Sequence, residues 1–191
     1  RNIPIYKSLL SFLNLNLNID YCIIGVASAG GVLPEEMRSD IILSLKNNIS
    51  IVNGLHSFLE DDLEISEIAK INNTKLYDIR KPRERDLLSF WSGKINQVKC
   101  PKIVVMGTDC GLGKRTTAKL IVENLRKNSF KSEMIYTGQT GWMQGWKFGF
   151  ILDSTYNDFV SGELEKMIFD CYKIEKPDFI LIEGQAALRN P

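Results

Sequence analysis

One segment of the chain, from Gly107 to Thr117, combines glycines, hydroxyls and a lysine in an order that suits phosphate binding. It stands between the apolar run 103–106 and a helical pattern that includes Leu125. A strand therefore leads through a glycine-rich turn into a helix N-terminus, where backbone N–H groups and the helix dipole favour an anion and Lys114 adds positive charge. We expect these residues to bind phosphate: Gly107, Thr108, Cys110, Gly111, Gly113, Lys114, Arg115, Thr116 and Thr117.

The spacing departs from that of the usual P-loop, in which a glycine stands six residues before the lysine and Ser or Thr directly follows it. Here Thr108 holds the first of these positions and Arg115 the second. The order Gly-Thr-Asp-x-x-x-Gly-Lys is similar to the opening of dethiobiotin synthetase and its relatives, which implies a P-loop on a parallel sheet. The alternative is a glycine-rich turn that binds nothing.

Two further stretches could complete a ligand site beside this turn. The strand pattern 133–136 leads into a second glycine-rich loop, and the buried-strand pattern 179–182 ends in Glu183. Such proteins hold magnesium or its water with a carboxylate there, so a magnesium-dependent enzyme would use Thr116 and Glu183 as metal ligands. The alternative for Glu183 is a solvated acid at a strand end. We expect these further residues to bind substrate: Thr137, Gly138, Thr140, Gly141 and Gln185.

Trp142 and Trp146 follow the second glycine-rich loop in the sequence. Their aromatic rings could stack on a flat ligand or simply fill a hinge, and the sequence favours neither interpretation.

The first eighty or so residues alternate apolar strand and helix patterns. Strands are expected over 21–26, 49–52 and 75–79, with helices that begin near Pro34 and Leu63. This β-α-β-α-β order predicts half of a doubly wound, Rossmann-like sheet. Its glycines do not form Gly-x-Gly-x-x-Gly, so a substrate-side or packing role is favoured over dinucleotide binding.

His56 follows the second of these strands, at the sheet edge where open α/β sheets bind ligands. We therefore keep it as a substrate-binding candidate; the alternative is a structural or exposed histidine. The polar, aromatic-studded stretch 83–100 predicts a linker between a domain over 1–82 and a P-loop domain over 101–191. Arg80, Arg83 and Arg85 are solvated charge or a grip on an acidic substrate.

Composition excludes several classes of function. The chain has 191 residues, 44% of them hydrophobic, and a formal net charge of +1 without a basic block, so neither nucleic acid nor an anionic membrane is expected as a partner. No stretch resembles a membrane span or a signal peptide. Four cysteines without Cys-x-x-Cys spacing and a single histidine give no zinc pattern, and a reduced, cytoplasmic protein fits best. Cys110 is a small loop residue or a reactive thiol.

Seven short motifs, in order along the chain, carry a resemblance to a known family. They are Gly25-Val26-Ala27-Ser28-Ala29-Gly30-Gly31, Gly54-Leu55-His56, Asp78-Ile79-Arg80, the loop 107–117, Thr137-Gly138-Gln139-Thr140-Gly141, Asp158-Phe159-Val160-Ser161-Gly162 and Glu183-Gly184-Gln185. The chain resembles a bacterial and archaeal family of two-domain P-loop proteins that long had no assigned function and that includes D-glutamate N-acetyltransferases.

That resemblance implies an α/β protein with a Rossmann-like N-terminal domain and a P-loop NTPase-like, parallel-sheet C-terminal domain. Known members are longer at both ends, so we expect the P-loop domain to be incomplete at its C-terminus. The Lys-x-Thr-Thr ending of the loop is similar to that of the family, which makes Arg115 a family feature.

Three functions follow as hypotheses. The first is an acyltransferase that moves acetyl from acetyl-CoA to the amino group of a D-amino acid such as D-glutamate. In it the loop holds CoA phosphates, and Asp109, Gln139 and Glu183 orient the amine or accept its proton. The second is an ATP- and magnesium-dependent ligase or kinase of the dethiobiotin synthetase type. The third is a non-catalytic nucleotide-binding module. The expected partner is a small amino acid substrate, and a homo-oligomer is compatible with the sequence.

Overall fold

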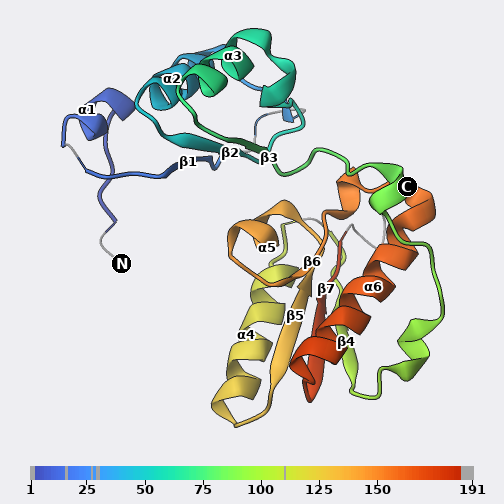
Figure 1. Cartoon of the computed structure of the whole chain (residues 1–191). Coiled ribbons are helices and arrows are strands. Elements are labelled where there is room, and N and C mark those ends of the chain that lie inside the picture. Colours follow the sequence, from blue (N-terminus) through green and yellow to red (C-terminus); the bar gives the residue numbers. More distant parts are fainter. Residues whose placement is uncertain (1–2, 16, 27, 29–30, 110, 186–191) are drawn as a thin grey trace. The chain divides into compact units, whose positions relative to one another are not determined.

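The computed structural model describes residues 3–15, 17–26, 28, 31–109 and 111–185, and the structure below is that of these residues. The expected turn residues 27, 29 and 30 and the phosphate-binding candidate Cys110 lie outside them. The chain divides into two compact units, residues 1–81 and 82–191. Each is an α/β unit with a parallel sheet of its own (Figure 1). The α/β prediction is therefore confirmed.

The first unit is the expected succession of strands and helices. Its elements are α1 (Leu9–Leu13), β1 (Tyr21–Ile24), α2 (Glu35–Lys46), β2 (Ser50–Asn53), the 3-10 helix η2 (Leu59–Asp61), α3 (Leu63–Ile71) and β3 (Leu76–Asp78). The strands lie in the order β1-β2-β3, and both neighbouring pairs are parallel. Helices α2 and α3 lie on the same face of this sheet (Figure 1).

The core of the first unit lies between the sheet and those two helices. Ile24 and Ile51 face Leu45 of α2 and Ile65 of α3, and all four side chains are buried. Side chains alternate across a strand, so Tyr21 and Ile23 point to the other face, where they are 54% and 55% exposed.

One charged cluster ties α2 to the start of α3. Asp62 caps α3 by accepting a hydrogen bond from the backbone N–H of Ile65 at 3.0 Å. The guanidinium of Arg38 donates to both oxygens of the same carboxylate, at 3.0 and 3.1 Å. These bonds hold the pKa of Asp62 below its usual range, although partial burial opposes them.

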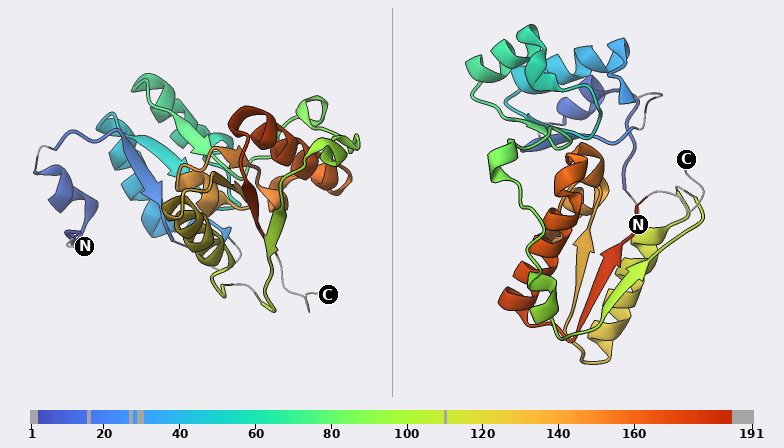
Figure 2. Two further views of the ribbon diagram at one scale, coloured as in Figure 1. Left: turned by 90° about the horizontal axis from the view of Figure 1, so that it is seen from below. Right: turned by 90° about the vertical axis from the view of Figure 1, so that its right-hand side faces the viewer.

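The second unit has a four-stranded parallel sheet in the order β4-β7-β5-β6. Its elements are η3 (Arg85–Leu87), η4 (Lys94–Gln97), β4 (Lys102–Val105), α4 (Lys114–Lys127), β5 (Ser132–Tyr136), α5 (Gln139–Met143), β6 (Phe148–Gly149), η5 (Leu152–Ser154), α6 (Asn157–Glu175) and β7 (Phe179–Glu183). Helices α4 and α6 cover opposite faces of this sheet (Figure 2).

Alternation along the strands divides the core of the second unit into two layers. Met134, Tyr136 and Leu181 pack with Ala118 and Val122 of α4. Ile135, Ile180 and Ile182 pack with Ile168 and Cys171 of α6. Both faces of the central strands β5 and β7 are therefore buried, as is usual for a parallel sheet covered by helices.

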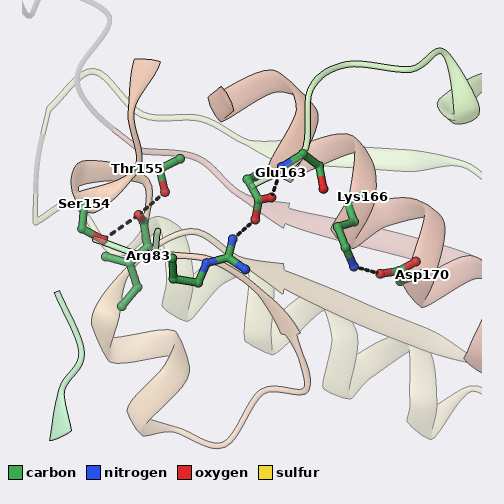
Figure 3. Close-up of polar contacts among 8 residues, drawn as sticks. Arg83, Ser154, Thr155, Glu163, Lys166 and Asp170 are labelled. Carbon is green, nitrogen blue, oxygen red and sulfur yellow. Dashed lines mark hydrogen bonds and ion pairs between the residues drawn. The ribbon is translucent and has the colours of Figure 1, made fainter. Parts of the chain in front are cut away.

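Two buried carboxylates of α6 bind the stretch that opens the second unit. Glu163 forms an ion pair with Arg83, as Figure 3 shows, and accepts a hydrogen bond from the backbone N–H of Ser89 at 2.8 Å. Glu165 accepts from Ser92 and Ile95 through its two oxygens. The stretch 83–100, expected as a linker, is thus held against α6 by charged hydrogen bonds between Arg83 and Ile95.

Gly162 of α6 is required for this contact. A Cβ atom added there would lie 2.0 Å from the carbonyl oxygen of Ser89. Arg83, predicted to be solvated charge or a grip on an acidic substrate, instead forms an ion pair with Glu163 that helps to hold this contact. Arg85 lies 4.5 Å from the ring centre of Tyr156, which places it in a cation–π contact instead.

Among the described residues, no helix is both long and apolar enough to cross a bilayer.

Cys22, Cys100 and Cys171 are free thiols, and burial raises the pKa of Cys171 to about 12.

Candidate functional site

The carboxyl ends of β4, β5 and β7 meet at one edge of the second sheet. The register pairs Val105 with Glu183, and Ile135 with Ile182. Gly184 keeps the chain after β7 next to β4, because its N–H donates to the carbonyl oxygen of Val105 at 3.1 Å. A Cβ atom added at Gly184 would lie 2.4 Å from that same oxygen. The glycine-rich turn after β4 and the loop after β5 therefore both start beside Glu183.

The turn between β4 and α4 has the backbone of an anion cradle. Gly111 and Gly113 have φ angles of 69° and 91°, a region that favours glycine. Gly113 is also the N-cap of α4 and supplies no side-chain acceptor, so the first-turn N–H groups can serve an anion.

Lys114 lies over this turn. Its Nζ donates to the carbonyl oxygen of Asp109 at 2.8 Å. Gly107 lies beneath its side chain, since a Cβ atom added there would be 3.2 Å from the Cδ of Lys114. A cation and a glycine-rich backbone are therefore brought together as the sequence predicts.

Glu183 is buried at this edge, with 5% of its surface exposed. Its Oε2 accepts a hydrogen bond from the backbone N–H of Thr137 at 3.1 Å, while the Thr137 hydroxyl donates to its backbone carbonyl at 2.8 Å. Burial raises the pKa of Glu183. The Thr137 N–H and the charges of Arg115 and Lys114 oppose that rise without overcoming it. The cradle and this carboxyl group therefore share one electrostatic environment.

Gly138 allows Gln185 and Glu183 to approach the loop after β5. A Cβ atom added at Gly138 would lie 2.7 Å from the Nε2 of Gln185 and 4.0 Å from the Oε1 of Glu183. The sequence predictions of Thr137, Gly138 and Gln185 thus converge with Glu183 in space.

The expectation of a glycine-rich loop over 137–141 is wrong in part, because Gln139 to Met143 form the short helix α5. Gly141 lets this helix pack on Tyr136, since an added Cβ atom would lie 2.2 Å from the Cβ of Tyr136. Gln139 and Thr140 thus lie in the first turn of α5.

The two tryptophans differ. Trp146 packs on the α4 layer, with the Arg126 guanidinium 5.7 Å from its ring centre, whereas Trp142 is 39% exposed. Of these two rings, that of Trp142 is therefore the more accessible to solvent.

The residues at this edge do not fit the usual magnesium site of a P-loop. Arg115 stands where the magnesium-binding hydroxyl is expected, and its charge acts on Glu183. The Arg115 Nε is buried and has no hydrogen-bond partner within the described part of the chain. Thr116 is exposed and lies one residue, about 100°, further around α4.

These features define the class of protein. A strand that leads through a glycine-rich turn and a lysine into a helix, on a parallel sheet, is a P-loop domain, and the β-α-β-α-β unit before it is Rossmann-like. The chain belongs to the DUF1611 family, a family of unknown function. Residues 1–82 match its Rossmann-like domain and residues 89–191 its P-loop domain.

Similar proteins extend this finding. The chain is 31% identical over 169 residues to a D-glutamate N-acetyltransferase of a Pseudoalteromonas species, covering 88% of this chain and 48% of that protein. It is 30% identical over 166 residues to a protein of the same description from Tritonibacter scottomollicae, covering 87% and 47%. The chain thus spans about half the length of these curated relatives.

A solved structure shares the fold. The match to the crystal structure of a DUF1611 family protein from Anabaena variabilis covers 100% of this chain and 53% of that protein's chain, with a TM-score of 0.88 and 29% identity.

His56, the remaining substrate-binding candidate, belongs to the first unit. Its Nε2 lies 2.8 Å from the Nη1 of Arg80, a partner that sequence reasoning did not assign to it. The motif Asp78-Ile79-Arg80 could have indicated this partner, because it starts at the last residue of β3, the strand that pairs with β2.

Proposed function

We propose that the protein is an N-acetyltransferase that moves acetyl from acetyl-CoA to the amino group of a D-amino acid such as D-glutamate. The observation that carries the proposal is a phosphate cradle beside a buried carboxyl group, with Arg115 in place of a magnesium ligand. The names of two relatives at about 30% identity support the reaction.

The cradle suits the phosphates of CoA. Gly111, Gly113 and the first turn of α4 supply backbone N–H groups, and Lys114 supplies a point charge. Arg115 adds a second positive charge at this sheet edge, where it acts on Glu183.

Glu183 suits the role of proton acceptor. A substrate ammonium first loses one proton to become a nucleophilic amine. Its nitrogen attacks the thioester carbon, the C–S bond breaks, and the second proton leaves the nitrogen as the thiolate becomes free CoA. Since burial raises the pKa of Glu183, its carboxylate is a stronger base than an exposed glutamate. In this proposal Asp109 and Gln139 orient the amine.

The direct test is incubation of the protein with acetyl-CoA and D-glutamate while free thiol is measured. We expect thiol release that depends on the D-amino acid and an N-acetylated product by mass spectrometry. Release no faster than hydrolysis, across a panel of D- and L-amino acids, would overturn the proposal.

Ligand-dependent melting separates this function from the ATP-dependent alternative. A ligand that binds only the folded state raises the melting temperature by mass action. We expect CoA to raise it equally with magnesium and with EDTA. A rise with ATP and magnesium, and none with CoA, would favour a ligase or kinase.

A further inference from the structure

The acid that ends β7 and the amide two residues later converge on one glycine. A Cβ atom added at Gly138 would lie 2.7 Å from the Nε2 of Gln185 and 4.0 Å from the Oε1 of Glu183. A hydrogen-bond donor and a carboxylate oxygen therefore lie around the same point. All three residues belong to the second unit.

The backbone that presents these two side chains is fixed by buried neighbours. The Thr137 hydroxyl donates to the backbone carbonyl of Glu183 at 2.8 Å, and the N–H of Gly184 donates to the carbonyl oxygen of Val105 at 3.1 Å. Thr137 and Gly184 are both buried. The chain therefore leaves β7 along a defined path, and Gln185 starts from a fixed position.

The two carboxylate oxygens of Glu183 have different environments. Oε2 accepts the backbone N–H of Thr137 at 3.1 Å, whereas Oε1 is the oxygen nearest to the Cβ position of Gly138. Oε1 is thus the oxygen that shares its surroundings with the Gln185 amide.

Gly138 makes room for that amide. Its φ and ψ angles are −139° and 161°, extended values that any residue adopts, so its own backbone does not require a glycine. The reason is steric instead, because the Nε2 of Gln185 approaches the place where a Cβ atom would stand.

A donor beside a general base suits attack on a thioester. When an amine nitrogen attacks the carbonyl carbon, the carbonyl oxygen becomes negatively charged, and a positioned N–H group stabilises that charge. The terminal torsion of a glutamine is broad, so the exposed Gln185 can turn an N–H toward such an oxygen. The positive charges of Lys114 and Arg115 act on the same edge and favour negative charge there.

We propose that Gln185 donates a hydrogen bond to the thioester carbonyl oxygen of the acyl donor, while Oε1 of Glu183 takes a proton from the attacking amine. The N–C bond forms as the C=O bond becomes C–O⁻. The C–S bond then breaks, the C=O bond returns, and the proton on Glu183 passes to the CoA thiolate. This step rests on the proposed function, but the contact of Gln185 with the carbonyl group can be tested without turnover.

Steady-state kinetics of the full chain test the role of Gln185. Because one donor to a developing oxyanion is lost, we expect Gln185→Ala to lower kcat by about 10²-fold and to leave KM for D-glutamate unchanged. Gln185→Glu keeps the size but loses the N–H donors, so it should be no more active than Gln185→Ala. Gln97→Ala, at an exposed glutamine that ends η4, is the matched control and should keep the parent kcat.

Gly138→Ala gives a second route to the same answer. The added methyl group would displace the flexible end of Gln185, whereas its 4.0 Å separation from Oε1 of Glu183 is an ordinary contact. We expect kcat to fall as it does in Gln185→Ala. In Gln185→Ala itself, the methyl group has no amide to displace, so the double variant should be no slower than Gln185→Ala. Far-UV circular dichroism and melting temperatures show whether each variant is folded.

Infrared spectroscopy reports the contact without any reaction. The probe is acetyl-CoA with an isotope label at the carbonyl carbon, bound without an amino acid. A hydrogen bond to the carbonyl oxygen lowers its stretching frequency. We therefore expect a lower frequency in the parent than in free acetyl-CoA, and a return to the free value in Gln185→Ala.

Three results would overturn the role of Gln185. One is an equal kcat in Gln185→Ala and the parent. Another is a raised KM for D-glutamate with an unchanged kcat, which would assign the amide to amino acid binding. The third is the absence of a frequency shift in the parent, including a failure of acetyl-CoA to bind. If the parent transfers no acetyl but shows the shift, and Gln185→Ala abolishes it, the proposed function fails while the contact of Gln185 stands.

Discussion

The two units place loops at equivalent edges of their parallel sheets, yet they prepare those loops in opposite ways. In the first unit, the side chains of Asn53 and Asp78 form hydrogen bonds with the backbone N–H and C=O groups of the loop after β2. In the second unit, the turn before α4 relies on glycines and leaves its helix N-terminus without a side-chain cap. One edge is completed by the protein, and the other is suited to completion by an anion.

The same contrast holds for one acid at each edge. Asp78 accepts three hydrogen bonds, whereas burial leaves Glu183 with a raised pKa. Burial of Glu183 disfavours its charged form, so this carboxylate readily accepts a proton. We therefore expect substitutions at the edge of the first unit to lower stability, and substitutions at the edge of the second unit to lower activity or ligand binding.

The largest effect is expected from Glu183→Gln. Loss of a general base should lower kcat by about 10²- to 10⁴-fold, as measured by thiol release. The parent rate should rise with pH along a limb that lies above the usual glutamate range, and the variant should lack that limb. Glu133→Gln, on the neighbouring strand β5, is the matched control. It should leave kcat and the rising limb of the pH–rate profile unchanged.

The stability of Glu183→Gln should change in the opposite direction. Because the folded-state pKa is raised, the stability that Glu183 contributes at low pH is lost as pH rises through that pKa. The amide oxygen of glutamine can still accept the Thr137 N–H. We therefore expect a higher melting temperature than the parent at pH 8 and no gain at pH 4; a lower one at pH 8 would contradict this view of the site.

Lys114→Ala should be next in size. Removing one charged hydrogen-bond donor to phosphate costs about 1.5–3 kcal/mol, or about 10- to 100-fold in CoA affinity. Lys119→Ala, on the same helix and paired with Glu123 at 3.7 Å, is the control. Equal losses in the two variants would indicate general electrostatics instead of a cradle.

Asn53→Ala should damage the first unit and spare the second. It leaves the buried N–H of Leu55 without its acceptor and removes one donor each from the Ser57 carbonyl and from Asp78, which we expect to cost about 3 kcal/mol of unfolding free energy. Hydrogen exchange of the β2 amides measures the loss. Asn47→Ala, at an exposed helix end, should cost about 1 kcal/mol or less.

Tryptophan fluorescence shows whether the second unit is affected, because Trp91, Trp142 and Trp146 all belong to it. A loss of CoA binding in Asn53→Ala, or a fluorescence transition shifted as far as the β2 exchange, would show that the units are not separable in this way.

The smallest effect is expected from Arg115→Gln. The Arg115 charge lowers the pKa of Glu183 against the effect of burial, so its removal should raise that pKa further. The rising limb of the pH–rate profile should move to higher pH, whereas Arg126→Gln, whose partner is Glu133, should leave it in place. A shift to lower pH would mean that the two groups do not interact as described.

Local signals were sufficient for much of the fold. The helix expected to begin near Leu63 is observed as Leu63–Ile71, since Asp62 caps it and its apolar residues follow helical spacing. The strand before the glycine-rich turn and the strand ending in Glu183 were also predicted, because apolar runs that meet glycines mark such strands.

What the sequence could not provide depends on distant partners. Helix α5 was missed because Gly138 and Gly141 suggest a loop, and only the packing of Gly141 on Tyr136 explains the helix. Glu163 carries no signal of burial, since its hydrogen-bond partner Ser89 is 74 residues away in sequence. The pairing of His56 with Arg80 likewise needed the sheet register.

The position of β7 has a consequence for synthesis on the ribosome. This strand lies between β4 and β5, although it is the last of the four in sequence. The first sheet, ordered β1-β2-β3, can add each strand as the nascent chain emerges. The second cannot close until Glu183 has been translated, so until then β4 has no partner strand and β5 is paired only with β6. A chaperone that protects unpaired strand edges should therefore engage the second unit during synthesis and pass over the first.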